Sequence, residues 1–274
     1  MLRRVPALAL LAALPALQGR VAAQTTPLIE AVVEGRFDAF TTDELGNVYA
    51  LRGDELTLFN PRGESWLRNS VKTFGRIAVL DAFYSLKPLL FSAEQGQLAM
   101  LDNTLSLQGS VINLPRSGFP QVVLACASVQ NHFWFFDQRE GELIRVDAQL
   151  RPVAATGRID QLIGLTPEPV QMQELDNWLY VNSPRHGILV FDIFGTYART
   201  IPLTDVERFE VRHRSLYLVR AGRFERFDLR ALDLTPLPLP PLQAGEVLRD
   251  ARVEQGRMML LLPDRIVIAR LPAP

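Results

Sequence analysis

The sequence predicts an all-β fold, a six-bladed β-propeller closed by an N-terminal strand that pairs in the last blade. The first observation behind this prediction is a repeated dipeptide, in which Asp or Asn follows an apolar residue at the end of an apolar run. Its polar position recurs every 36 to 45 residues, in Phe59-Asn60, Leu101-Asp102, Val146-Asp147, Phe191-Asp192 and Phe227-Asp228. A fixed period of this length built from short strands is typical of a radial repeat with one blade per period.

The second observation is that turn residues separate short apolar runs inside each period. Gly and Asn in these turns tolerate positive φ, and Pro falls between the runs rather than inside them. The order of runs and turns predicts strands at 37–41, 48–51, 56–59 and around 66–67 in the first blade, and at 76–81, 88–92, 97–101 and 107–113 in the second. In the third blade strands are predicted at 122–128, 132–137, 142–146 and 152–156, and in the fourth at 169–174, 178–182, 188–191 and 198–202. In the fifth blade they are predicted at 208–212, 215–220, 223–227 and 235–239.

The third observation concerns the two ends of the repeat. The sixth blade has only three candidate strands, at 250–254, 257–262 and 265–271, whereas the apolar segment 27–33 belongs to no complete blade. Pairing of 27–33 with 265–271 would close the ring and remove two exposed sheet edges. Another all-β fold, such as a pair of sandwiches, would also give short strands, but it does not explain five copies of one dipeptide at one period.

The N-terminal residues 1–23 are predicted to be a signal peptide, which leaves 24–274 as a single propeller domain. Arg3 and Arg4 form a basic start, the apolar run 5–17 follows, and small residues precede a cleavage site near Ala23. The run is shorter than the roughly 20 residues that span a bilayer. We therefore expect a periplasmic or secreted protein without a transmembrane segment in the mature chain; an N-terminal membrane anchor is the alternative.

Charge and cysteine content narrow the class of partner. Removal of three arginines with the signal peptide lowers the 29 basic residues to 26, against 30 acidic residues. This balance argues against a nucleic-acid partner. Cys126 is the only cysteine, so an intrachain disulfide is excluded, and its small, apolar surroundings predict a buried structural thiol rather than a nucleophile.

One motif carries a resemblance to a known group of proteins. Asp43-Glu-Leu-Gly-Asn-Val-Tyr49 followed by Leu58-Phe59-Asn60 resembles the repeat of six-bladed propellers of the NHL and gluconolactonase-like superfamily. The later blades lack the Asp-x-x-Gly-Asn turn. In layout the chain is also similar to small exported bacterial propellers of unassigned function, which implies a location in the cell envelope.

The resemblance implies an alternative function, a metal-dependent hydrolase or lactonase. Such enzymes hold a divalent cation at the central axis through oxygen ligands. The candidate acids on the predicted inner strands or beside them are Asp38, Asp81, Glu168, Glu174, Glu210 and Asp250, with Arg36, Arg208 and Arg249 nearby. The competing interpretation is that these acids pair with arginines, so the sequence by itself assigns no metal ligand, no cofactor and no catalytic residue.

The leading hypothesis is a non-enzymatic binding or scaffold propeller that engages an envelope protein or surface ligand through one axial face. In a propeller, the loops between second and third strands share a face with the blade-to-blade connections. The candidate binding residues in these loops are Arg116, Phe119, Arg139, Arg185 and His186. For Phe119 the alternative is that its ring caps an inner strand.

Overall fold

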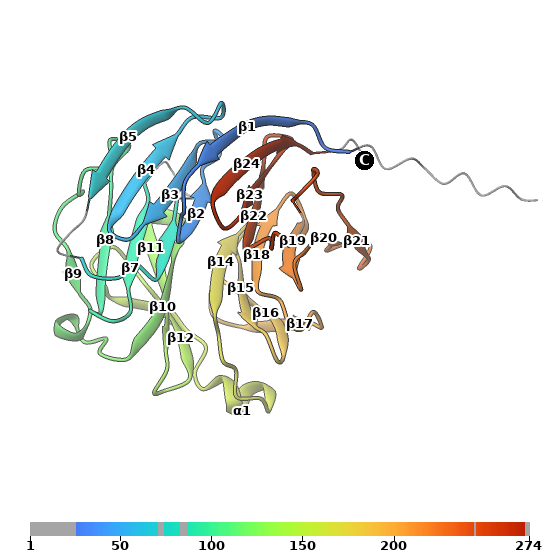
Figure 1. Ribbon diagram of the computed structural model, residues 1–274. Helices are drawn as coiled ribbons and strands as arrows, with labels where there is room; N and C mark the ends of the chain where they lie inside the picture. Colours follow the sequence, from blue (N-terminus) through green and yellow to red (C-terminus); the bar gives the residue numbers. More distant parts are fainter. Residues whose placement is uncertain (1–25, 71–73, 83–86, 244, 272–274) are drawn as a thin grey trace, which may run out of the picture.

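The computed structural model describes residues 26–70, 74–82, 87–243 and 245–271, which form six four-stranded antiparallel sheets (Figure 1). The innermost strand of each sheet contacts the innermost strand of both neighbouring sheets, so the sheets form a closed ring. The structure therefore confirms the six-bladed β-propeller. The predicted signal peptide lies outside the described residues. Within the described residues, no helix is long and apolar enough to cross a membrane.

Each blade runs from an inner strand at the axis to an outer strand at the rim. In that order the first blade contains β2 (Ala39–Thr42), β3 (Val48–Arg52), β4 (Glu55–Phe59) and β5 (Ser65–Ser70), and the second contains β6 (Val79–Asp81), β7 (Leu89–Ser92), β8 (Gln97–Met100) and β9 (Ile112–Asn113). The third blade contains β10 (Val122–Ser128), β11 (His132–Asp137), β12 (Glu142–Val146) and β13 (Pro152–Ala155), and the fourth contains β14 (Gln171–Leu175), β15 (Trp178–Ser183), β16 (Gly187–Asp192) and β17 (Tyr197–Ile201). The fifth blade contains β18 (Arg208–Arg212), β19 (Ser215–Arg220), β20 (Arg223–Asp228) and β21 (Leu234–Pro236), and the sixth contains β22 (Asp250–Glu254), β23 (Arg257–Leu261), β24 (Arg265–Arg270) and β1 (Ile29–Glu34).

The sixth blade takes its outer strand from the beginning of the chain. β1 pairs antiparallel with β24, with Val33 opposite Ile266. Val33 is buried, and Glu30 forms ion pairs with Arg257 and Arg270 at 2.7 Å each. Both apolar burial and charge pairing thus hold the two ends of the propeller together.

The repeated dipeptide is a structural element of the turn between the third and fourth strands. In each of the five copies the Asp or Asn carboxylate or amide oxygen accepts hydrogen bonds from two backbone N–H groups further along the turn. The acceptors are Asn60, Asp102, Asp147, Asp192 and Asp228, with N···O distances of 2.8 to 3.0 Å. A side chain that satisfies the turn's own backbone explains why this residue type recurs once per blade.

The hydrophobic core lies between neighbouring blades rather than in one central mass. β11 illustrates this, because its side chains alternate between two interfaces. Phe133 and Phe135 pack with residues of the second blade, whereas Trp134 packs with residues of the fourth. Cys126 belongs to the latter cluster and is buried, as predicted, and burial raises the pKa of its thiol well above the ordinary value.

Two local predictions differ from the structure. The segment 107–113 was expected to be one strand, but only Ile112–Asn113 pairs as β9, because Gly109 adopts a φ of 80° and turns the chain away from β8. A short helix that the sequence did not predict, α1 (Ile159–Ile163), lies between the third and fourth blades (Figure 1). With only five residues, α1 is too short to produce a readable helical period.

Candidate functional site

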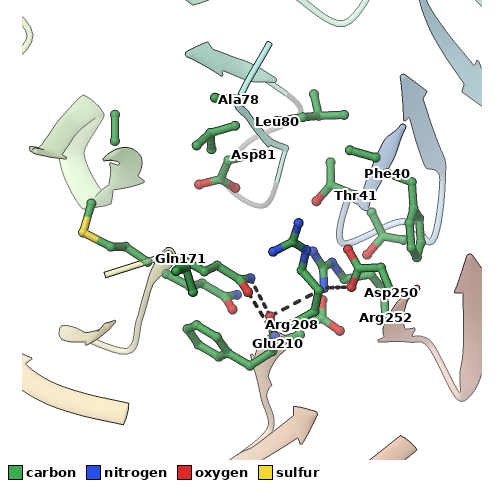
Figure 2. A pocket seen from close by; sticks show the side chains of 18 residues that line it. Phe40, Thr41, Ala78, Leu80, Asp81, Gln171, Arg208, Glu210, Asp250 and Arg252 are labelled. Atoms are coloured by element: carbon green, nitrogen blue, oxygen red, sulfur yellow. Dashed lines mark hydrogen bonds and ion pairs between the residues drawn. The ribbon is translucent and has the colours of Figure 1, made fainter. Parts of the chain in front are cut away.

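A cavity of about 140 Å³ lies on the propeller axis, where the inner strands converge. Figure 2 shows charged and amide side chains that reach into it from different blades. Its polar lining comprises Thr41, Thr42, Asp81, Gln171, Gln173, Arg208, Glu210, Asp250 and Arg252. Side chains of inner strands point toward the axis at every second position, so residues far apart in the sequence meet here.

The positive charge of the cavity comes from two arginines of neighbouring blades. Arg252 forms an ion pair with Asp250 at 2.8 Å, and its guanidinium lies over the ring of Phe40, 5.6 Å from the ring centre. Arg208 extends between Asp81 and Asp250 in Figure 2. The two guanidinium groups thus offset the carboxylates around them.

Glu210 and Asp250 are the two buried acids among the described residues that line the cavity. Glu210 accepts a hydrogen bond from the backbone N–H of Val253 at 2.7 Å, and Arg212 lies 3.3 Å from its other oxygen. Burial raises the pKa of Glu210 to about 7, although Arg252 and Arg212 oppose the shift by stabilising the charged form. Arg212 also forms an ion pair with Glu254 at 2.6 Å.

Polar side chains of the inner strands join neighbouring blades from the second to the sixth, at positions about one repeat apart. The exposed edge of an inner strand carries backbone groups that have no strand partner, and these groups need hydrogen bonds. Gln171 and Gln173 each exchange two hydrogen bonds with backbone groups 38 residues further along, in β18. Asp81 accepts from the N–H of Ala127 in the same manner, 46 residues away.

Glu174 makes the densest of these connections. Its carboxylate accepts hydrogen bonds from the Ser128 hydroxyl, the Val129 N–H and the Trp134 indole N–H, which all belong to the third blade. Only 1% of Glu174 is exposed. This side chain, which the sequence suggested as a metal ligand, instead binds three donors of the protein itself.

The structure separates the six acids that were candidates for a cation site. Asp81, Glu210 and Asp250 line the axial cavity, whereas Asp38 and Glu168 are exposed, where Asp38 accepts a hydrogen bond from the Gly53 N–H and Glu168 pairs with Arg185. Among the described residues, no three His, Cys, Asp or Glu side chains are placed to share a metal ion.

The motif that carries the family resemblance is also structural. Asp43 is fully buried and accepts hydrogen bonds from the N–H groups of Leu45 and Asn47, from the Asn47 amide and from the Tyr49 hydroxyl. Burial and the neighbouring Asp43 carboxylate raise the pKa of Tyr49 well above its ordinary value. This motif forms a closed turn and offers no free ligand atom to a metal.

We call the surface that carries the second-to-third-strand loops and the blade-to-blade connections the connection face. Four of the five predicted binding residues lie on it. Arg116 is exposed in a single turn of 3₁₀ helix, and the guanidinium groups of Arg139 and Arg185 pair with the carboxylates of Glu140 at 3.6 Å and Glu168 at 3.4 Å, respectively. The Nδ1 atom of His186 lies 3.0 Å from the Ser183 hydroxyl. These loops come from different blades, so the structure places the residues around the axis rather than in one cluster.

The exposed position predicted for Phe119 is wrong. Only 8% of Phe119 is exposed, and its ring packs edge-on against Phe135, with 5.4 Å between ring centres. A left-handed turn at Gly118 and a hydrogen bond from the Phe119 N–H to the Leu114 carbonyl direct the ring into the interface between the second and third blades. The inward position of the Phe119 ring agrees with the alternative interpretation, in which this ring caps an inner strand.

An open groove on the connection face adjoins the axial cavity. It measures about 570 Å³, and it shares Val170 and Arg208 with the cavity. Its lining is Val170, Pro184, Asp205, Val206, Glu207, Arg208 and Arg249. Arg185 follows the lining residue Pro184 in the chain but does not itself line the groove.

Sequence reasoning missed two of the arginines near the axis. Arg212 and Arg252 are buried, yet nothing in the composition distinguishes them from the other arginines. A usable signal was the alternation of Asp250, Arg252 and Glu254 with small apolar residues in β22, since a period of two directs all three side chains to one side of the strand.

Similarity to solved structures supports the fold. No protein-family model and no curated protein sequence matches the chain. The WD40 domain of Neurospora crassa Pan2 superimposes with a TM-score of 0.64 at 8% identity, over 92% of this chain and 97% of that one. Streptogramin B lyase gives 0.61 at 11% identity, over 90% and 97%. The structure of BBS1N in complex with ARL6DN gives 0.56 at 11% identity, over 86% and 78%. These likenesses show a β-propeller fold.

Proposed function

We propose that the protein is an exported, non-enzymatic binding or scaffold propeller of the bacterial cell envelope. In this proposal residues 1–23 are a signal peptide, 24–274 are the mature propeller domain, and the protein works in the periplasm or outside the cell. Its partner is an envelope protein or surface ligand that docks on the connection face.

The observation that carries the proposal is the contrast between the axial cavity and the groove beside it. The cavity of about 140 Å³ is smaller than the roughly 300 to 1,000 Å³ of small-molecule sites. Of its acids, Asp81 and Glu210 accept hydrogen bonds from the backbone of the next blade, and Asp250 pairs with Arg252. The groove of about 570 Å³ is open, and three exposed arginines of the predicted set, Arg116, Arg139 and Arg185, lie on the same face.

The arrangement of charges suits recognition of another macromolecule. Arg116 has no hydrogen bond or ion pair through its side chain to any residue that the structure describes, and the ion pairs of Arg139 and Arg185 are solvent-exposed. Exposed pairs of this kind contribute little to folding stability, so the arginines are available for exchange with acidic groups of a partner. A BBS1 propeller bound to ARL6 shows that a similar fold can hold a protein partner.

The proposal is tested with the double variant Arg116→Glu with Arg185→Glu. A matched control, Arg62→Glu with Arg151→Glu, reverses two exposed arginines in turns of the opposite face. Affinity capture from an envelope extract should recover the same partner with the wild type and the control, and lose it with the connection-face variant. Equal recovery by all three proteins, with unchanged melting temperatures, would exclude this face.

The alternative, a metal-dependent hydrolase or lactonase, is distinguished by elemental analysis of the purified protein. A stoichiometric divalent cation that is lost on Glu174→Gln or Asp38→Asn would favour the enzyme. The positions of these two acids favour the binding function, because Glu174 is saturated by three donors and Asp38 binds a backbone N–H on the surface.

A further inference from the structure

A second cleft lies on the opposite side of the ring, which we call the hairpin face because it carries the turns between first and second strands and between third and fourth strands. The cleft has a volume of about 300 Å³ and lies between the fourth and fifth blades. Its lining is Leu175, Asp176, Trp178, Tyr180, Arg199, Val211, Arg214, Leu229 and Arg230. None of these residues contributes to the axial cavity or to the groove of the connection face.

The inner part of the cleft is apolar. Leu175 and Leu229 are partly buried and pack against the cluster that joins the two blades, which also contains Tyr180 and Val211. Trp178 stands on the same strand as Tyr180, two residues away, so both rings face the same interface. Trp178 is 41% exposed, so part of its ring is accessible in the cleft.

The rim of the cleft is cationic. Arg199 comes from the outer strand of the fourth blade, and Arg214 and Arg230 come from two turns of the fifth. All three are exposed, and none has a hydrogen bond or ion pair through its guanidinium to a residue in the described part of the chain. Asp176 is the one acid of the lining, so the cleft carries an excess of positive charge.

The backbone holds two of these arginines in place. His213 and Arg214 form a tight hairpin turn in which both residues have positive φ, 43° and 63°. A hydrogen bond from the Leu229 N–H to the Arg214 carbonyl, 3.0 Å long, connects this turn to the turn that carries Arg230. Asp228 fixes the turn that carries Arg230, because its carboxylate accepts a hydrogen bond from the Arg230 N–H at 2.8 Å. These hydrogen bonds fix the backbone from which the side chains of Arg214 and Arg230 extend.

We propose that this cleft binds an apolar carboxylate, either a free organic acid or the C-terminal residue of a peptide. The guanidinium groups match a carboxylate through paired N–H donors, and the floor of Leu175 and Leu229 with the exposed face of Trp178 accepts an apolar or aromatic group attached to it. A volume of about 300 Å³ corresponds to the lower limit for small-molecule sites, which suits one group of side-chain size. The site is independent of the proposed connection-face function.

The test measures binding of two carboxylates and their neutral amides by isothermal titration calorimetry. 3-Phenylpropionate represents a free acid, N-acetyl-phenylalanyl-phenylalanine represents a peptide terminus, and the corresponding amides lack the charge. We expect saturable binding of a carboxylate and at least about tenfold weaker binding of its amide. Preference for the first or the second probe identifies the source of the carboxylate.

Three variants locate the binding site. Arg214→Gln with Arg230→Gln should weaken binding of the carboxylate at least about tenfold, because each removes a charged donor. Arg62→Gln is the matched control: Arg62 occupies the same place in the turn of the first blade that Arg230 occupies in the fifth, with the same hydrogen bond from its backbone N–H. Asp176→Asn should tighten binding a few-fold, since it removes the one repulsive charge and Asn tolerates the positive φ of this position.

Several outcomes would overturn the proposal. They are the absence of saturable binding for both carboxylates at millimolar concentration, equal binding of acid and amide, or equal weakening by Arg62→Gln and by the rim variant. Arg116→Glu with Arg185→Glu should leave this binding unchanged, so failure of the connection-face function and failure of the cleft are distinguishable. Unchanged circular dichroism and melting temperature show that the variants remain folded.

Discussion

The indole N–H of Trp134 donates a hydrogen bond to the carboxylate of Glu174, with 2.7 Å between Nε1 and Oε2. It joins the second strand of one blade to the inner strand of the next, and both residues are buried. Similar contacts by Gln171, Asp81 and Glu210 show that the charged and amide side chains at the axis hold the ring together.

Replacement of Glu174 by Ala should lower the free energy of unfolding by about 3 kcal/mol or more, because three buried donors lose their acceptor at roughly 1–3 kcal/mol each. Urea unfolding followed by circular dichroism measures the loss. Glu168→Ala is the control, since its pair with Arg185 is exposed and should contribute less than about 1 kcal/mol. Similar stabilities of the two variants would contradict a bridging role for Glu174.

Glu210 should make stability depend on pH between about 4.5 and 7. The folded-state pKa of about 7 lies above the ordinary 4.5. The folded protein therefore retains a proton that the unfolded chain has released, so this contribution favours folding at low pH and is lost as the pH rises through about 7. The total is of the order of 3 kcal/mol, because one pKa unit corresponds to about 1.4 kcal/mol.

The measurement compares urea unfolding of the wild type and Glu210→Gln at pH 5 and pH 8. The wild type should gain stability relative to the variant at pH 5 and lose that gain at pH 8. A difference between the two proteins that stays constant with pH would show that Glu210 is ionised throughout this range.

Deletion of residues 24–34 should destabilise the ring, because it removes β1 and leaves β24 as an unpaired edge. Loss of the buried Val33 and of the Glu30 ion pairs, together with exposure of the sixth blade, should lower the melting temperature markedly and promote aggregation. Deletion of 24–27 is the control, because it retains β1 and the Leu28 carbonyl that accepts from the Arg270 N–H. Light scattering and thermal unfolding distinguish the two; a monomeric 24–34 deletion of near-parental melting temperature would be contrary to this prediction.

Replacement of Gly187 by alanine should destabilise the protein much more than replacement of Gly222. Both have positive φ, 100° and 69°, so alanine is strained at either position by roughly 1–2 kcal/mol. At Gly187 an added Cβ would also collide with the Ile201 carbonyl oxygen, while at Gly222 it would meet no atom within 4 Å. Thermal unfolding should show a much larger loss for Gly187→Ala than for Gly222→Ala, and equal losses would disprove the collision.

The number of blades, most strand positions and the turn residues can be predicted from the sequence alone. These features depend on local chemistry: an Asp or Asn that satisfies the backbone of its own turn, and apolar runs of strand length on either side. In the sixth blade the strands predicted at 250–254, 257–262 and 265–271 agree with β22, β23 and β24 to within one residue at each end. The short β9 departed from its predicted range because positive φ at Gly109 interrupts the pairing.

The contacts of the charged residues, in contrast, depend on the tertiary structure. The donors that Glu174, Glu210 and Asp81 bind in neighbouring blades lie between 40 and 46 residues away, so no local spacing in the sequence predicts these hydrogen bonds. The tertiary structure also directs the Phe119 side chain inward. It brings Trp178 into the same cleft as Arg214 and Arg230, which belong to another blade. Ring closure sets these distances, because the angle between successive blades, and not the sequence separation, determines which side chains meet at the axis and in the clefts between blades.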